Sequence, residues 1–340
     1  MMKLGVFDHL DSSGQPLQAL YEDRLRLAER YDQAGIHAYH VAEHHATPLG
    51  MAPSPGIFLS ALAQRTKRLR FGPAVYCLPL YHPIRLAEEI CMLDQMSGGR
   101  LELGIGRGIS PIELGYYQVD PAEAPGRYRE FLDLLLGVLT GKTARFDGQY
   151  YSIDDMPFEL SPFQKPHPPL WYGLLKPESA TWPAGQGINV LSNQPSAVVA
   201  KTVAAYRSAW EEAQDKETGI DSTMPLMGMT RHVVVADTDE AALAIARPAY
   251  LRWRQSFVQL WERHGSSPIG MDLPDTFDGL MKIGMGVAGA PSSVRDRLAA
   301  QIDEAGVNYF VGRFCFGDIT FDNAARGLDL FVEKVWPDLP

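Results

Sequence analysis

The segment Glu43-His44-His45 follows an apolar stretch that begins near Tyr39, and it brings one acid and two imidazoles together. Side chains alternate along a strand, so His44 should point to one side and Glu43 and His45 to the other. Titratable groups are costly in an apolar core and useful at the mouth of a barrel. Taken alone, the segment fits an acid–base site or an ordinary polar junction between a strand and a loop.

A second chemical feature is the segment Gly104-Ile105-Gly106-Arg107-Gly108. Its glycine spacing is GxGxG and not GxGxxG, which argues against a Rossmann dinucleotide loop. Arg107 could donate two hydrogen bonds to a phosphate, or it could be a buried arginine paired with a carboxylate. Lys176 and Ser179 lie at the start of a predicted helix, where free N–H groups and the helix dipole attract anions. Together these groups would suit a phosphate.

The elements that must position these residues alternate between short apolar runs and helical periodicity, which is typical of a parallel sheet. Helices are predicted between the strands, with Gly35 ending the first helix and Pro83 opening another. About eight strands favour a (β/α)₈ TIM barrel in a single α/β domain over residues 1–340, with reactive groups at the carboxyl ends of the strands. The predicted strands are 4–7, 37–42, 69–78, 101–106, 170–173, 188–191, 232–236 and 307–311.

Two segments interrupt this alternation. Residues 141–169 are expected to form an inserted excursion with a hairpin, whose tight turn would be Asp147-Gly148 because both residues tolerate positive φ. Residues 265–291 are rich in Gly, Ser, Pro and Met and precede the last barrel unit. Long aperiodic loops are either functional or without a role, and we take 265–291 as a candidate lid.

Aromatic residues near the predicted rim are candidates for a substrate cavity. Tyr76, His82 and Tyr116 lie close to predicted strand ends or in loops, where they could line an apolar cavity. His9, after the first strand, is another possible cavity residue. On one predicted helix, by contrast, three aromatic residues recur every fourth position, which usually indicates a packed face: Trp253, Phe257 and Trp261.

Composition excludes several classes of function. The net charge of −10 disfavours binding to nucleic acid or to anionic membranes. Three scattered cysteines without a CxxC pair argue against a disulfide framework and a structural zinc site, and they fit a reducing cytoplasm. The most apolar run, Leu132 to Leu139, is too short to span a bilayer. We therefore expect a cytoplasmic protein without a metal site.

With these residues in place, the chain resembles the bacterial luciferase-like, flavin-dependent monooxygenases over nearly its whole length. The matching motifs are individually short, but they occur in the family's order and spacing. They are Met2 to Phe7, Ala42-Glu43-His44-His45, Leu78-Pro79, His82-Pro83, Leu93 to Leu101, Gly104 to Gly108, Pro177-Glu178-Ser179-Ala180 and Leu328 to Pro337.

The resemblance implies FMN bound at the strand carboxyl ends, with His44 as the catalytic imidazole and with Arg107 and Ser179 on the flavin phosphate. Ala74-Val75 matches a bulge under the isoalloxazine, where relatives have a non-proline cis peptide. Glu43 and His45 would shape the site from behind, with a structural role favoured for His45. Lys176 stands where many relatives carry a small hydroxyl residue, so it could either add charge for the phosphate or crowd the site.

The resemblance also implies a reaction. Reduced FMN, supplied by a separate flavin reductase, would use O₂ to oxidise a small, apolar organic substrate, in a chain that forms a homodimer. The nearest alternative is a hydride-transferring oxidoreductase that uses a deazaflavin on the same barrel. A metal-dependent hydrolase fits less well, because the sequence has no HxH pair on the first strand and no HExxH helix. A flavin-binding protein without catalysis is a further alternative, against which the presence of His44 argues.

Overall fold

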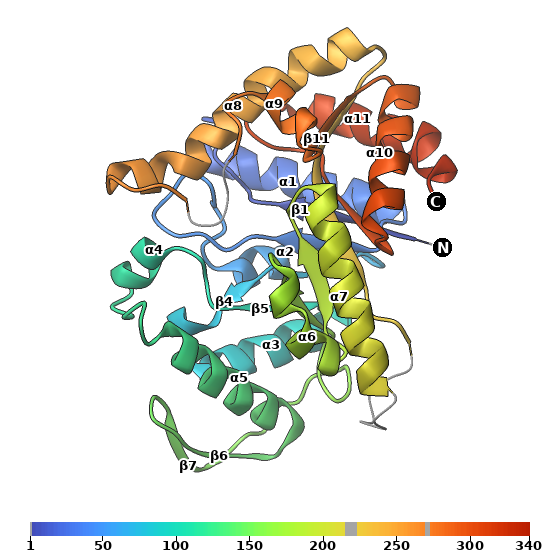
Figure 1. Cartoon of the computed structure of the whole chain (residues 1–340). Helices are drawn as coiled ribbons and strands as arrows, with labels where there is room; N and C mark the ends of the chain where they lie inside the picture. The colour runs from blue at the N-terminus through green and yellow to red at the C-terminus, as the bar shows by residue number, and fades with distance from the viewer. Residues whose placement is uncertain (1, 215–222, 269–272) are drawn as a thin grey trace.

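The computed structural model describes residues 2–214, 223–268 and 273–340, and a barrel of parallel strands surrounded by helices forms its centre (Figure 1). Hydrogen bonds join β1 (Lys3–Asp8) to both β2 (Ala38–Val41) and β12 (Tyr309–Arg313), and they join β4 (Tyr76–Cys77) to β5 (Leu103–Gly106). The paired strands run from β3 (Arg70–Pro73) at one end of the sheet to β4 at the other, and because β4 continues β3, the sheet closes on itself. The predicted TIM barrel is therefore confirmed. The strands around the described barrel are β1 (Lys3–Asp8), β2 (Ala38–Val41), β3 (Arg70–Pro73) continued by β4 (Tyr76–Cys77), β5 (Leu103–Gly106), β8 (Leu170–Gly173), β9 (Asn189–Ser192), β10 (Met227–Val235) and β12 (Tyr309–Arg313).

The third strand is interrupted where it meets its neighbour. The peptide bond between Ala74 and Val75 is cis and separates β3, which pairs with β2, from β4, which pairs with β5. Two glycines on β5 make room for this bulge. A Cβ atom at Gly106 would collide with the Val75 side chain, and one at Gly104 would collide with the Pro73 carbonyl. The sequence therefore lets the bulge press against the fourth barrel strand.

Most of the predicted helices are present, with ends that differ by a few residues. Pro55 and Pro83 stand in the first turns of α2 and α3, and Gly35 follows α1 with a φ of +74°. Where we expected a helix over 178–184, the chain forms a 3₁₀ turn, η2 (Pro177–Ser179), followed by the short α6. The matching helices are α1 (Leu17–Gln33), α2 (Pro55–Arg65), α3 (Pro83–Ser97), α5 (Ala124–Thr140), α6 (Thr181–Gly185), α7 (Ser196–Gln214), α8 (Asp239–Arg263) and α11 (Phe321–Lys334).

The prediction of one aperiodic loop over 265–291 is wrong. This segment contains α9 (Phe277–Lys282) and the strand β11 (Gly286–Gly289), which pairs with residues 232–235 of β10. Four residues bounded by glycine are too few for a periodic signal, although Val287 and Ala288 are buried. Residues 269–272 of the candidate lid lie outside the described residues. The helices α4 (Pro111–Tyr116) and α10 (Pro291–Ala305) were also not predicted.

The inserted hairpin consists of β6 (Thr143–Asp147) and β7 (Ser152–Pro157), and it lies beside α5 (Figure 1). The expected two-residue turn is wrong, because neither Asp147 nor Gly148 has a positive φ. A four-residue connection over 148–151 replaces it. The Glu130 carboxylate of α5 accepts hydrogen bonds from the backbone N–H groups of Gln149 and Tyr150, at 2.9 and 2.8 Å, and so fixes the loop.

Side chains fill the interior of the barrel. Trp171 and Tyr309 are fully buried there with their ring centroids 5.2 Å apart, and the Tyr309 hydroxyl hydrogen-bonds His40 Nε2 at 2.9 Å. The barrel is thus a packed core with its open space at one end. None of the helices in the described parts of the chain has the length and apolar character needed to cross a membrane.

Candidate active site

A cavity of about 830 Å³ opens at the carboxyl ends of the barrel strands. It is formed by segments that lie far apart in the chain. His44 follows β2, Arg107 follows β5, Ser179 comes from η2, and Arg313 ends β12. The aromatic and aliphatic side chains of α8 form another wall. Three of the residues that we assigned to the rim from sequence, His44, Arg107 and Ser179, are therefore brought together by the fold.

His44 is the imidazole that faces this cavity, with about one fifth of its side chain exposed. Its Nδ1 lies 3.2 Å from the Glu113 carboxylate of α4, and its ring stacks on that of His9 at 5.7 Å. Glu113 lies in the first turn of α4 (Pro111–Tyr116), which Ser110 caps by accepting a hydrogen bond from the Glu113 N–H. Because Nδ1 is engaged by Glu113, Nε2 is the nitrogen left to exchange a proton with a bound molecule.

Glu43, which lines the cavity, forms a pair with His45, which does not. The Glu43 side chain is fully buried, and its Oε1 lies 2.9 Å from His45 Nε2. Its Oε2 accepts hydrogen bonds from the Tyr81 hydroxyl at 2.7 Å and the Cys77 N–H at 3.3 Å. This arrangement confirms the expected alternation, since His44 points away from both residues. Glu43 ties the end of β2 to the end of β4.

Burial changes the acidity of the groups around Glu43. Desolvation, reinforced by the Glu43 carboxylate, raises the pKa of the Tyr81 phenol and of the Cys77 thiol well above their usual values. Both groups therefore stay protonated and act as donors. His9 is buried beside Arg313, and desolvation followed by this neighbouring charge lowers the pKa of its imidazole well below the usual value. His9 is a neutral ring between His44 and Trp253, which donates from Nε1 to His9 Nδ1 at 3.3 Å.

The groups proposed for a phosphate are placed at the exposed rim. Arg107 and Ser179 line the same cavity, and Gly108 beside Arg107 has a φ of +81°. Lys176 is exposed and is not among the described lining residues. The backbone N–H groups of Ser179 and Ala180 already donate within η2, to the carbonyls of Lys176 and Pro177. The Arg107 guanidinium and the Ser179 hydroxyl, and not a helix end, are thus what these segments offer to an anion. A second exposed arginine, Arg129 of α5, lines the same cavity.

The expected substrate-cavity residues Tyr76, His82 and Tyr116 do not line the described cavity. Tyr76 is only 1% exposed, because strand alternation directs Val75 and Cys77 inward and Tyr76 towards the outer helices. His82 is exposed at the start of α3. The Tyr116 hydroxyl lies on the surface, 2.8 Å from His264 Nε2. The prediction placed Tyr76 on the cavity side of the third strand, whereas its two neighbours, Val75 and Cys77, are the residues that face the cavity.

The aromatic residues of α8 serve two purposes. Trp253 is buried and stacks on Phe257 at 5.4 Å, as expected for a packed face. Phe257 and Trp261 also line the cavity. Helical periodicity shows that a face is covered but not whether protein or ligand covers it. Within the described residues, no cluster of His, Cys, Asp or Glu could hold a metal ion.

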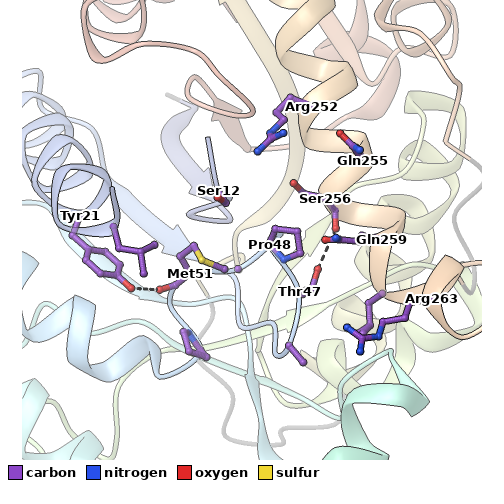
Figure 2. A pocket seen from close by; sticks show the side chains of 15 residues that line it. Ser12, Tyr21, Thr47, Pro48, Met51, Arg252, Gln255, Ser256, Gln259 and Arg263 are labelled. Atoms are coloured by element: carbon purple, nitrogen blue, oxygen red, sulfur yellow. Dashed lines mark hydrogen bonds between the residues drawn. The ribbon is translucent and has the colours of Figure 1, made fainter. Parts of the chain in front are cut away.

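A second cavity, of about 730 Å³, lies on the other side of residues 46–53 and is shown in Figure 2. It shares Thr47 and Leu260 with the first cavity. Two hydrogen bonds fix the dividing loop: the Tyr21 hydroxyl donates to the Met51 carbonyl at 2.6 Å, and Thr47 donates to the Ser256 carbonyl at 3.1 Å (Figure 2). Its described lining has arginines and amides but no imidazole or carboxylate, so the first cavity is the candidate active site.

Comparison with known proteins gives a consistent result. A family model described as luciferase-like monooxygenase matches residues 2–309. Over 321 residues the chain is 43% identical to an uncharacterized protein, y4wF, of Sinorhizobium fredii, covering 94% of this chain and 92% of that protein. It is 31% identical over 257 residues to the oxygenase component of a flavin-dependent trigonelline monooxygenase of Acinetobacter baylyi, covering 72% of this chain and 68% of that protein.

Solved structures share the fold over the whole chain. The monooxygenase RslO1 of Streptomyces bottropensis superimposes with a TM-score of 0.88 at 25% identity, covering 99% of both chains. Two structures at lower identity show the fold alone, each covering 100% of this chain and 99% of theirs. They are the oxygenating constituent of 3,6-diketocamphane monooxygenase of Pseudomonas putida in complex with FMN, at 21% identity and TM-score 0.82, and the coenzyme F420-dependent tetrahydromethanopterin reductase of Methanopyrus kandleri, at 20% and 0.69.

Proposed function

The chain belongs to the luciferase-like monooxygenase family and is an oxidoreductase, and from this premise we propose that it is the oxygenase component of a two-component flavin monooxygenase. In this proposal it receives reduced FMN from a separate flavin reductase and uses O₂ to oxidise a small organic substrate. One observation carries the proposal: Arg107 and Ser179 line the same cavity as the His44 imidazole, although 135 positions separate His44 from Ser179 in the chain.

The cavity has the size and lining that a flavin mononucleotide requires. Its volume of about 830 Å³ lies within the range of cofactor sites, roughly 300–1,000 Å³. One rim carries a guanidinium and a hydroxyl for the phosphate, while the walls away from that rim are largely apolar. The Ala74–Val75 bulge reaches the cavity and offers a backbone surface for a flat ring. In the described part of the chain, Arg107 forms no ion pair that would compete with a phosphate.

We assign each residue a role within this proposal. Arg107 and Ser179 hold the phosphate, Ala74 and Val75 support the ring, and Glu43 fixes the wall from behind. When bound, reduced FMN supplies the electrons that activate O₂. His44 moves a proton at Nε2 while Glu113 orients its Nδ1. Phe257, Leu260 and Trp261 exclude water from the reacting groups. Lys176 is left out of the phosphate site, because it does not line the cavity.

The rival function is hydride transfer to or from a deazaflavin, and one titration separates the two. Purified protein is titrated with FMN, reduced FMN and coenzyme F420, followed by oxygen uptake with each reduced form. We expect reduced FMN to bind in a 1:1 complex that consumes O₂ at a rate different from that of free reduced FMN. Tight binding of F420 without binding of either form of FMN would replace the proposal with the rival, and binding of none of the three would refute both.

We also propose that the chain forms a homodimer through α2 and α3. Ile57 on α2 and Met92 and Met96 on α3 are large apolar side chains with more than half of their surface exposed. The helices α2 and α3 pack against each other, and exposed apolar side chains on adjacent helices are typical of an interaction surface. Light scattering should give twice the mass of 37.6 kDa for the wild type and a smaller mass for Met92→Lys/Met96→Lys. A monomeric wild type would refute this part of the proposal.

A further inference from the structure

The inner end of the candidate active site carries a buried cation that has no ion pair among the described residues. The buried Asp11 carboxylate favours its charged form electrostatically but lies beyond ion-pair distance. Arg313, the last residue of β12, is only 5% exposed and lines the cavity. Among the described residues it has no ion pair, and its Nε has no hydrogen-bond acceptor. Its one hydrogen bond runs from Nη1 to His232 Nδ1 at 3.5 Å, the outer limit for such a bond. A buried charge in this condition is costly unless something compensates it.

A second buried arginine in the same barrel shows what a structural role looks like. Arg231 on β10 is also fully buried without a carboxylate partner among the described residues. It donates to four neutral acceptors at 2.7–3.1 Å, which are the side chains of Gln301 and Ser196 and the carbonyls of Gln194 and Thr230. Alternation on β10 directs Arg231 to the outside of the barrel, whereas Arg313 faces the inside, where its Nε has no acceptor among the described residues although Asn193 lines the same recess.

The space in front of Arg313 has the size of a small anionic group. A recess of about 120 Å³ continues the main cavity inward and shares Phe7, Ala74, Val75 and Arg313 with it. This volume corresponds to about four water molecules at about 30 Å³ each, which is enough for a carboxylate group. Thr230 lines the recess, is 2% exposed, and has a hydroxyl without a hydrogen-bond partner among the described residues. A guanidinium and a hydroxyl thus face one recess.

We propose that Arg313 and Thr230 form a receptor for an anionic oxygen group, such as a carboxylate, at the inner end of the cavity. Two donors of this kind match a carboxylate oxygen pair. The faces of Phe7 and Trp253, whose ring centroids lie 4.7 and 5.9 Å from the Arg313 guanidinium carbon, hold the side chain in place without using its N–H groups. Burial also lowers the pKa of Arg313 to about 10, which leaves it charged at neutral pH.

The anionic group has two possible sources, which share this chemistry. One is an organic acid substrate whose apolar body lies against Phe257 and Trp261 of α8. The other is the anionic form of reduced flavin, and this source rests on the proposed function. The receptor itself does not rest on it, because carboxylate binding can be measured without flavin.

The first arm of the test measures carboxylate binding to the flavin-free protein. Calorimetric titrations compare acetate with acetamide and benzoate with benzamide, which differ in charge but hardly in shape. For the substrate source, we expect the acid of at least one pair to bind 10-fold or more tightly than its amide. Arg313→Met should abolish this preference, Arg313→Lys should retain part of it, and Thr230→Val should reduce it 2- to 5-fold. Arg252→Met, which removes an exposed arginine lining the second cavity, should leave it unchanged.

The second arm compares the affinities for reduced and oxidised FMN in the same variants. For the flavin source, Arg313→Met should lower the ratio of these affinities 10-fold or more, seen as a lower midpoint potential. If neither the carboxylate preference nor this ratio changes in Arg313→Met and Arg313→Lys, the receptor is refuted. If FMN does not bind at all, the proposed function fails while the first arm still decides the receptor. A lower thermal midpoint of Arg313→Met, without any change in ligand binding, would show a structural arginine like Arg231.

Discussion

Replacing Arg107 with alanine should weaken the binding of FMN and leave the binding of riboflavin nearly unchanged. The two ligands differ only in the phosphate, so their comparison isolates the group that Arg107 is proposed to hold. A charge-assisted hydrogen bond contributes about 1.5–3 kcal/mol, and solvent screening places an exposed rim residue near the lower value. Since about 1.4 kcal/mol is a tenfold change in Kd, we expect FMN to bind roughly 10-fold more weakly. The riboflavin affinity should change less than about twofold.

Quenching of flavin fluorescence at several salt concentrations measures both dissociation constants. The matched control is Lys176→Ala, which removes a cation close to Ser179 in sequence that does not line the cavity. If a diffuse positive potential held the phosphate, both variants would weaken FMN binding equally. A contact at Arg107 predicts a large effect for Arg107→Ala only, with a smaller salt dependence in that variant. Equal losses of FMN and riboflavin affinity in Arg107→Ala would refute the phosphate role.

Three further predictions concern the cluster after β2 and the barrel interior. His44→Ala should retain flavin binding but lower turnover about 100-fold or more, measured as product formed per reduced flavin; unchanged turnover would exclude His44 from proton transfer. Glu43→Ala leaves His45, Tyr81 and the Cys77 N–H without their acceptor, so the free energy of unfolding in urea should fall by about 3 kcal/mol, and by clearly less in Glu43→Gln. Burial lowers the pKa of His40 to about 3, so the unfolded chain binds the extra proton below pH 6.5 and stability falls as the pH drops. Between pH 7.5 and 5 this group should cost the wild type about 2 kcal/mol of unfolding free energy, and His40→Gln should lose correspondingly less over the same interval.

The parts of the fold that the sequence predicts are those in which a local pattern and the tertiary structure agree. Each strand of the barrel is a short apolar run between turn residues, and α2 and α3 carry a proline in their first turns. The sequence pattern does not predict the strand β11, because its four residues include two glycines and its partner β10 lies some 50 residues earlier. Its pairing depends on the whole barrel, and no local pattern encodes it.

The same distinction applies to the candidate site, where local patterns predict some residues and miss others. His44, Arg107 and Ser179 could be found because strand ends gather at one rim of a parallel barrel. Glu113 could not, since it lies on the six-residue helix α4, too short to give a periodic signal. Arg313 could not either. Only the packing of β10, β12 and α8 shows that it is buried without an ion pair among the described residues. Tyr76 was misplaced because the bulge at Ala74–Val75 decides which face each neighbour takes.

The division of labour between adjacent residues after β2 follows from strand geometry. Alternation places Glu43 and His45 on one side, where four hydrogen bonds hold their side chains: the bond between them, two from Tyr81 and the Cys77 N–H to Glu43, and one between the Tyr117 hydroxyl and His45. His44 lies on the other side, and its ring faces the cavity. The hydrogen bonds of its two neighbours also hold the backbone of His44 in place. The fully buried Glu43 carboxylate is therefore paired within the scaffold, while about one fifth of the His44 side chain stays exposed. A shift of one residue in the register of β2 would exchange these roles, so the position of His44 depends on the buried pair beside it as much as on its own contacts.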